Sequence, residues 1–203
     1  HVDVEAPEGN MVIDIGGGTT EVAVVSLGGV VESESIKTAG DAFDEAIVRY
    51  VRRKHNILIG KRTAEELKIG IACLVPRAEV GIQEVKGRCL TNGLPKSVKI
   101  SSVELVEAIA EPARDILETI HMVLERTPPE LVADVAQNGI IMAGGGSLIY
   151  GFDQLVEKDT GIRTTVVDDA LSCAAFGSGK MLMNLNDMQD GMVNLARKRQ
   201  MKA

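Results

Sequence analysis

The stretch Ile13-Asp-Ile-Gly-Gly-Gly-Thr-Thr-Glu21 decides the fold. The apolar run from Met11 to Ile15 predicts a buried strand that enters a tight glycine turn. Glycine lets the backbone approach an anion and turn its N–H groups toward phosphate oxygens, and the hydroxyls of Thr19 and Thr20 can add donors. Asp14 cannot bind phosphate directly, so we expect it to hold the hydrated Mg²⁺ that accompanies a nucleotide. The alternative is a glycine-rich hairpin with a turn-forming Asp.

A second glycine turn, Met142-Ala-Gly-Gly-Gly-Ser-Leu148, lies much later in the chain. It separates a predicted strand, Gly139 to Ala143, from a predicted helix that begins at Ser147. Dinucleotide-binding turns have spaced glycines, whereas three consecutive glycines favour a flat backbone wall against a base or sugar. The alternative is a tight strand-to-helix connection without a ligand.

The residues between the two turns predict further strands and helices. Leu27-Gly-Gly29 is a hairpin signal, so three antiparallel strands should open the chain. Asp41 is placed to cap the first helix, and Thr63 to Glu66 form a capping box that starts a short second helix. The other expected elements are strands at Thr20–Ser26, Val30–Thr38, Ile82–Leu90, Ser97–Ile100 and Arg163–Val167, a helix at Ala170–Leu185 and a weakly helical tail from Asn186.

The longest predicted helix begins at a second capping box, Ser101-Ser-Val-Glu104. Its apolar residues recur with helical spacing as far as Leu124. Pro112 should kink this helix because proline removes a backbone donor, and Pro128-Pro129 should end it. In the first helix, the cluster Arg49, Arg52, Arg53 and Lys54 is expected to form the solvated face.

Composition narrows the class of protein. A net charge of −7 over 203 residues argues against a general nucleic-acid binder. No apolar run is long enough to span a membrane, and His1 to Asn10 contain no hydrophobic targeting core. The three cysteines, Cys73, Cys89 and Cys173, are far apart, which predicts buried, reduced thiols in a cytoplasmic protein. Because the first strand begins almost at once and no starting Met is present, we expect a piece of a longer chain.

Two glycine turns in this order, with a hairpin sheet first and a kinked long helix between the turns, resemble the superfamily of actin, DnaK-type chaperones and sugar kinases. Within it, the chain from Met11 to about Leu185 is most similar to the bacterial actin-like MreB/Mbl family. The motifs that carry this resemblance are Ile13–Glu21, Ala39-Gly-Asp-Ala-Phe-Asp-Glu-Ala-Ile47, Thr63-Ala-Glu65, Pro128-Pro-Glu-Leu131 and Ala143-Gly-Gly-Gly-Ser-Leu148. DnaK-type chaperones usually have Thr-Phe-Asp after the glycines, where this chain has Thr-Thr-Glu.

The resemblance implies ATP or ADP with Mg²⁺ as cofactors and assigns a role to each matching residue. The implied roles are Mg²⁺ through water for Asp14, the β- and γ-phosphates for Gly16, Gly17, Gly18, Thr19 and Thr20, the ribose side for Gly40 and Asp41, the base and ribose for Glu65 and Lys68, and adenosine for Gly144, Gly145 and Gly146. An ion pair on the helix surface is the alternative for Glu65 and Lys68. Family members commonly have an acid where this chain has Gly70, so base contacts there are less firmly implied than phosphate contacts.

The resemblance also implies a fold and a biological role. The expected fold is α/β: an RNase-H-like lobe at 1–40 and 102–203, with a smaller α+β insertion at 41–101. The implied parent is a cytoplasmic protein at the inner face of the membrane that binds ATP, forms filaments and works with cell-wall and membrane scaffold proteins to set rod shape. The alternatives are a lobe of a phosphotransferase or chaperone ATPase, or a non-catalytic interaction module.

The family's first phosphate loop, another Asp-x-Gly-Thr-like turn, does not occur in this sequence. The acid that positions the attacking water in this family is also expected from a first lobe. Phosphoryl transfer depends on groups on both sides of the γ-phosphate. No catalytic residue is therefore assigned in this chain, and these 203 residues alone are expected not to hydrolyse ATP.

Overall fold

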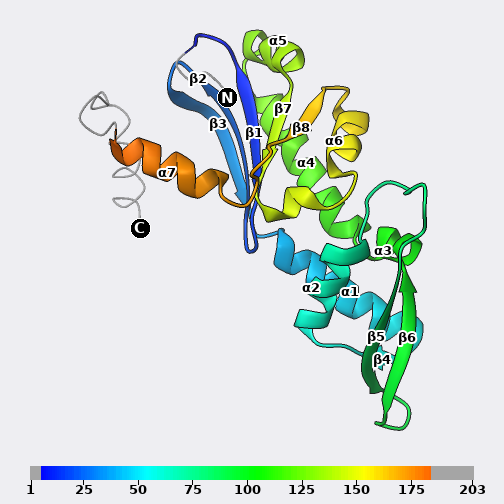
Figure 1. The fold of residues 1–203 in the computed structure, drawn as a ribbon. Helices are drawn as coiled ribbons and strands as arrows, with labels where there is room; N and C mark the ends of the chain where they lie inside the picture. The colour runs from blue at the N-terminus through cyan, green and yellow to red at the C-terminus, as the bar shows by residue number, and fades with distance from the viewer. Residues whose placement is uncertain (1–5, 184–203) are drawn as a thin grey trace.

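A five-stranded sheet forms the centre of the larger part of the chain (Figure 1). The computed structural model describes residues 6–183. The strands are β1 (Asn10–Ile15), β2 (Thr20–Ser26), β3 (Gly29–Ile36), β7 (Ile140–Ala143) and β8 (Thr164–Val166), in the order β3-β2-β1-β7-β8. The first three are antiparallel, as predicted, whereas β7 and β8 join in parallel.

One face of this sheet is packed and holds much of the core. Met11, Ile13 and Ile15 of β1 are fully buried, and the register places them beside Val24, Val22 and Thr20 of β2. The helix α4 (Ala110–Arg126) packs across β2 and β3. Alternation with period two sends Val12 and Asp14 to the opposite, less buried face. Asp14 is therefore kept out of the core by the strand that presents it.

A second, three-stranded sheet is built from the residues of the expected insertion. Its strands are β4 (Ile57–Leu58), β5 (Ile82–Cys89) and β6 (Pro95–Ser101), in the order β4-β5-β6. Two helices, α1 (Gly40–His55) and α2 (Lys61–Ile71), pack against each other and lie between this sheet and the larger one (Figure 1). Within the described part of the chain, residues 41–101 contribute no strand to the five-stranded sheet.

The expected single kinked helix is wrong, because the structure has two helices there. The first, α3 (Ser102–Ala108), ends at Ile109, whose φ of −101° and ψ of 5° interrupt the helical backbone, and α4 follows. Pro112 lies in the first turn of α4, where a missing N–H leaves no intrahelical bond unmade. The prolines at 128 and 129 begin an unpredicted helix, α5 (Pro129–Asn138), which has proline in its first position.

Three predicted helix starts also differ from the structure. The residue that precedes α1 is Ala39 and not Asp41, and α2 begins at Lys61, so Thr63 does not cap it. After the second glycine turn the chain forms a short 3₁₀ helix, η1 (Gly145–Leu148), and α6 (Phe152–Thr160) begins only later. The last described helix is α7 (Cys173–Met183), and the predicted tail from Asn186 lies outside the described residues.

All three cysteines are free, but only Cys73 is buried as expected. Cys89 is half-buried and Cys173 is exposed, so the expectation of buried thiols is wrong for these two. None of the helices between residues 6 and 183 is both long enough and apolar enough to cross a membrane.

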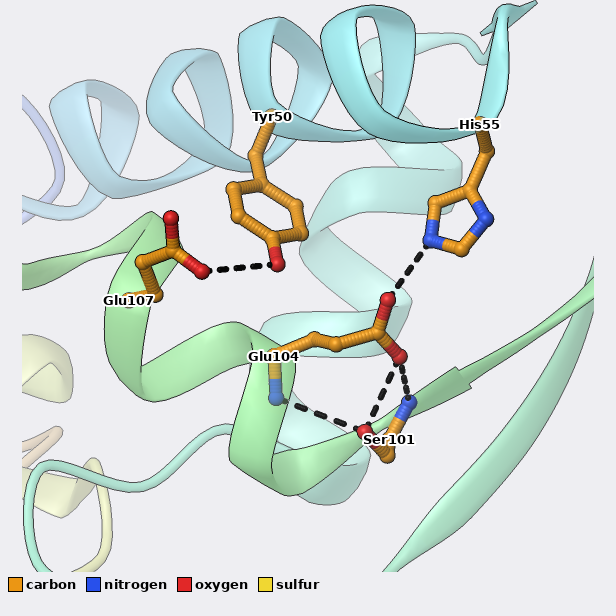
Figure 2. A network of polar contacts seen from close by, with 5 residues as sticks. All are labelled: Tyr50, His55, Ser101, Glu104 and Glu107. Carbon is orange, nitrogen blue, oxygen red and sulfur yellow. Dashed lines mark hydrogen bonds and ion pairs between the residues drawn. The ribbon is translucent and has the colours of Figure 1, made fainter.

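A polar strip joins α1 to α3 (Figure 2) and, through Arg49 and Glu111, to the start of α4. Arg49 and Arg53 are exposed, as predicted, and lie 4.0 Å from Glu111 and 3.8 Å from Glu107. The Tyr50 hydroxyl donates to Glu107 at 3.1 Å. The strip therefore fastens the helix of the expected insertion to the helices that follow it.

The predicted capping box at Ser101 is confirmed and is extended by a histidine (Figure 2). The Ser101 hydroxyl accepts from the Glu104 amide, and the Glu104 carboxylate accepts from the Ser101 amide at 3.0 Å. The other carboxylate oxygen lies 2.7 Å from Nε2 of His55, at the end of α1. Burial would raise the pKa of Glu104, but the hydrogen bonds from Ser101 and His55 outweigh it and lower this pKa below 4.5.

We expect Glu104→Gln to lower the free energy of unfolding by about 1 kcal/mol near neutral pH, because a neutral amide replaces the carboxylate that accepts from Ser101 and contacts His55. A folded-state pKa below the unfolded value means that the ionised carboxylate stabilises the fold above about pH 4.5, and that this contribution disappears as the pH falls further. Urea unfolding between pH 3 and pH 7 should thus show the two proteins converging in acid. The control Glu118→Gln, at an exposed position on α4, should change little at any pH. A constant difference across this range would contradict the assignment.

Candidate functional site

The first glycine turn is closed by the backbone and faces open space. The amide of Gly16 donates to the carbonyl of Thr19 at 2.9 Å, which shapes the link from β1 to β2. Gly17, Gly18 and Thr19 are exposed, and a methyl group at Gly17 or Gly18 would meet no other atom within 4 Å. Among the hydrogen bonds of the described residues, the amides of these three residues have no partner. The turn therefore offers three free N–H donors to an anion.

The two threonines after the glycines have different surroundings. Thr19 is exposed, so its hydroxyl is free to meet a ligand. Thr20 is fully buried, and its hydroxyl donates to the carbonyl of Thr38 at 2.7 Å. The expectation that the Thr20 hydroxyl faces a phosphate is thus wrong for this conformation, because its proton is already used inside the fold.

Asp14 is the last residue but one of β1, at the edge of this turn. It is directly opposite Glu21 in the antiparallel register, so both carboxylates lie on the same, less buried face of the sheet. Burial, and then the charge of Glu21, raise the pKa of Asp14 above its ordinary value of 3.8. A nearby cation would relieve both effects, because it replaces lost hydration and offsets the repulsion.

The second glycine turn lies directly beside Asp14. The parallel pairing of β1 with β7 places Asp14 opposite Ala143, so the turns that follow both strands meet at one edge of the sheet. Gly144 has a φ of 81°, and a Cβ there would overlap the Ile15 carbonyl oxygen and Oδ1 of Asp14. Gly146 packs equally tightly, against the side chain of Ile15. Gly145, between them, is exposed and near Leu171.

The start of α1 is bonded to the first turn. The amides of Gly40 and Asp41 donate to the carbonyls of Gly16 and Gly17 at 3.0 and 2.8 Å. A Cβ at Gly40 would lie only 3.2 Å from the Gly16 oxygen, so this close approach favours glycine. The Asp41 carboxylate is exposed and pairs with Lys61 at 2.9 Å, and this ammonium lowers the pKa of Asp41.

Glu65 and Lys68 share α2 but do not form the alternative, a surface ion pair with each other. Glu65 is exposed, whereas the Lys68 side chain is 13% exposed and its ammonium lies 2.8 Å from Oδ1 of Asp44. The same ammonium donates to the Gly40 carbonyl at 3.0 Å. The surface ion pair between Glu65 and Lys68 is therefore wrong, and Lys68 joins α2 to the beginning of α1.

Asp44 and Lys61 are two site residues that the sequence analysis missed. Asp44 had a signal, because it is an acid among the apolar residues of α1, where a buried partner is expected. Lys61 pairs with an acid twenty positions earlier, and nothing in the local pattern indicates that contact.

The arrangement fits a nucleotide phosphate better than a metal held by protein groups alone. Free amides and open space at Gly17, Gly18 and Thr19 suit phosphate oxygens. Between residues 6 and 183, no three acidic, histidine or cysteine side chains are grouped so that they could hold a metal ion. A single acid at the edge of a phosphate site suits Mg²⁺, which keeps several waters and takes other oxygens from phosphates.

We expect Gly144→Ala to lower the free energy of unfolding by at least about 2–3 kcal/mol, because its backbone conformation is nearly exclusive to glycine and the methyl group would overlap β1. The same substitution at Gly17, where space is open, should cost less than about 1 kcal/mol. Urea denaturation of both variants measures the difference. Equal losses would show that the two turns do not differ in packing.

Comparison with known proteins agrees with this geometry. The model of the family described as MreB/Mbl protein matches residues 1–190. The cell shape-determining protein MreB of Escherichia coli K12 is 46% identical over 188 residues, which cover 93% of this chain and 54% of that protein. The chain thus spans about half the length of this relative.

Solved structures support the same assignment. MreB5 of Spiroplasma citri, crystallised with ADP and with AMPPNP, is 38% identical, with TM-scores of 0.88 and 0.89 over 91% and 92% of this chain and 56% of its own. The MamK double helical filament is 28% identical, with a TM-score of 0.66 over 79% of this chain and 50% of its own. The expected actin-like α/β fold is therefore confirmed, and the chain belongs to the MreB/Mbl family.

Proposed function

We propose that this chain is the ATP- and Mg²⁺-binding lobe of a bacterial actin-like protein that forms filaments and helps to set rod cell shape and wall synthesis. The observation that supports this best is the meeting of two glycine turns at the ends of β1 and β7, with three free amides and the Asp14 carboxylate between them. The crystal forms of MreB5 with ADP and AMPPNP favour an adenine nucleotide over other anions.

Each group of residues is assigned to one part of the nucleotide. The amides of Gly17, Gly18 and Thr19, supported by Gly16 and the backbone of Thr20, bind the β- and γ-phosphates. Gly40 and Asp41 lie on the ribose side with Glu65 and Lys68, and the backbone of Gly144, Gly145 and Gly146 faces the adenosine. Asp14 holds Mg²⁺ through water, and the ion, when bound, neutralises charge on the phosphates.

Filament formation is proposed from family membership and from the MamK filament, which has the same fold. The other partners are a first lobe of the same protein and the scaffold proteins of the wall and membrane. The proposed location is the cytoplasm, at the inner face of the membrane.

Asp14→Asn should leave the fold intact. We expect Mg²⁺ to increase the affinity for ADP roughly tenfold in the unaltered chain, and this increase should be mostly lost in the variant, as for other groups that act on a metal through its ligands. Titration of the ¹⁵N-labelled chain with ADP, with Mg²⁺ or with EDTA, measures this gain through the amide signals of Gly17 to Thr19. Glu21→Gln is the matched control, because Glu21 lies opposite Asp14 but away from the second turn. An unchanged Mg²⁺ effect in Asp14→Asn would contradict the role of Asp14.

The purified chain should release no phosphate from ATP above the rate without protein. Its described residues offer donors to one side of the triphosphate, and each missing group that stabilises or positions the reacting phosphate is worth orders of magnitude in rate. A phosphate-release assay with the chain as a monomer tests this. Turnover at the rate of a two-lobed relative would mean that a complete active site lies within these residues.

A further inference from the structure

The most buried ion pair among the described residues lies between α1 and α2, next to the first glycine turn. It joins Asp44 to Lys68 at 2.8 Å, and the two side chains are 4% and 13% exposed. Burial raises the pKa of Asp44, although the adjacent Lys68 opposes this effect. Because removing two charges from water costs about as much as their attraction returns, stability alone does not explain such a pair.

The position of the pair offers a better explanation. The Lys68 ammonium also donates to the Gly40 carbonyl at 3.0 Å, while the amide of Gly40 donates to the Gly16 carbonyl at 3.0 Å. Gly40 thus connects the ammonium to the turn. The next amide, from Asp41, holds the Gly17 carbonyl at 2.8 Å. A continuous chain of polar contacts therefore runs from the buried carboxylate of Asp44 to the turn.

We propose that Asp44 is a positioning residue for nucleotide binding: it orients Lys68, which holds Gly40 against the first glycine turn and so aims the free amides of Gly17, Gly18 and Thr19. This inference rests on the proposed function. Asp44 is only 3% exposed and so cannot reach a ligand in this structure. Lys68 uses its ammonium on two protein oxygens, which gives it a structural role besides any direct contact with the nucleotide.

The decisive variant is Asp44→Asn, and Glu107→Gln is its matched control. Both changes convert an acid to an amide, but Asp44 lies near the start of α1 and faces α2, whereas Glu107 lies on α3 and accepts from Tyr50 farther along α1. Without the carboxylate, Lys68 keeps a buried charge with no counterion, so it should turn toward water and release Gly40. Hydrogen exchange at the amides of Gly40 and Asp41 should then become roughly tenfold faster than in the control, because local opening at the start of α1 is easier. The exchange rates of the amides in β1 and β2 serve as the internal reference.

Nucleotide binding provides the second measurement. The affinity for MgADP should fall roughly tenfold in Asp44→Asn and stay unchanged in Glu107→Gln, as for a group that supports a binding site without touching the ligand. If the unaltered chain does not bind MgADP, the proposed function fails, and the exchange experiment still tests the contact chain. If the chain binds but both variants bind equally well, the positioning role is wrong.

A second variant covers the possibility that Asp44→Asn does not fold. The double change Asp44→Asn with Lys68→Met removes both charges, which usually keeps a protein folded. Only hydrogen exchange is measured for this double variant, because Lys68 is also a candidate contact for the nucleotide. Fast exchange at Gly40 and Asp41 supports the proposal. Protection equal to that of the unaltered chain would overturn it, since the pair would then be dispensable for the position of Gly40.

Discussion

The parallel pairing of β1 with β7 is the contact on which the site depends. These strands are about 130 positions apart in the sequence, yet Asp14 and Ala143 are neighbours in the sheet. Parallel strands end at the same edge, so each delivers its glycine turn to one place. The fit at Gly144 is so close that a single methyl group would overlap both Ile15 and Asp14. Sheet register thus places the proposed phosphate, adenosine and metal groups together.

The helix α1 connects the first glycine turn to the second sheet. It begins on the carbonyls of Gly16 and Gly17 and ends at His55, which contacts Glu104 (Figure 2). A helix is stiff over this length, so a shift at one end is felt at the other. The polar strip with α3 and α4 therefore fixes how the residues of the expected insertion are held against the larger lobe.

The local parts of the fold were predictable, and the contacts distant in sequence were not. The Ser101 capping box was found because its partners are three residues apart, and the opening hairpin because glycine marks its turn. The same pattern at Thr63 failed, since α2 begins two residues earlier, at Lys61, whose side chain pairs with Asp41. The partner of Lys68 was missed because Asp44 lies 24 positions earlier, on another helix.

The role of Thr20 could have been inferred, because strand alternation places it on the buried face with Val22 and Val24. Residue type alone made it look equivalent to Thr19.

The two Asp–Lys pairs between α1 and α2 show why residue type is not enough. Asp41 with Lys61 and Asp44 with Lys68 have nearly equal separations, 2.9 and 2.8 Å. The first pair is more than half exposed, so water and salt screen it and it contributes little to stability. Either side chain of this pair can therefore leave its partner and bind a ligand. The second is withdrawn from water, so breaking it leaves an uncompensated charge. Two similar contacts therefore serve different ends: one leaves a carboxylate available beside the site, and the other keeps the site in shape.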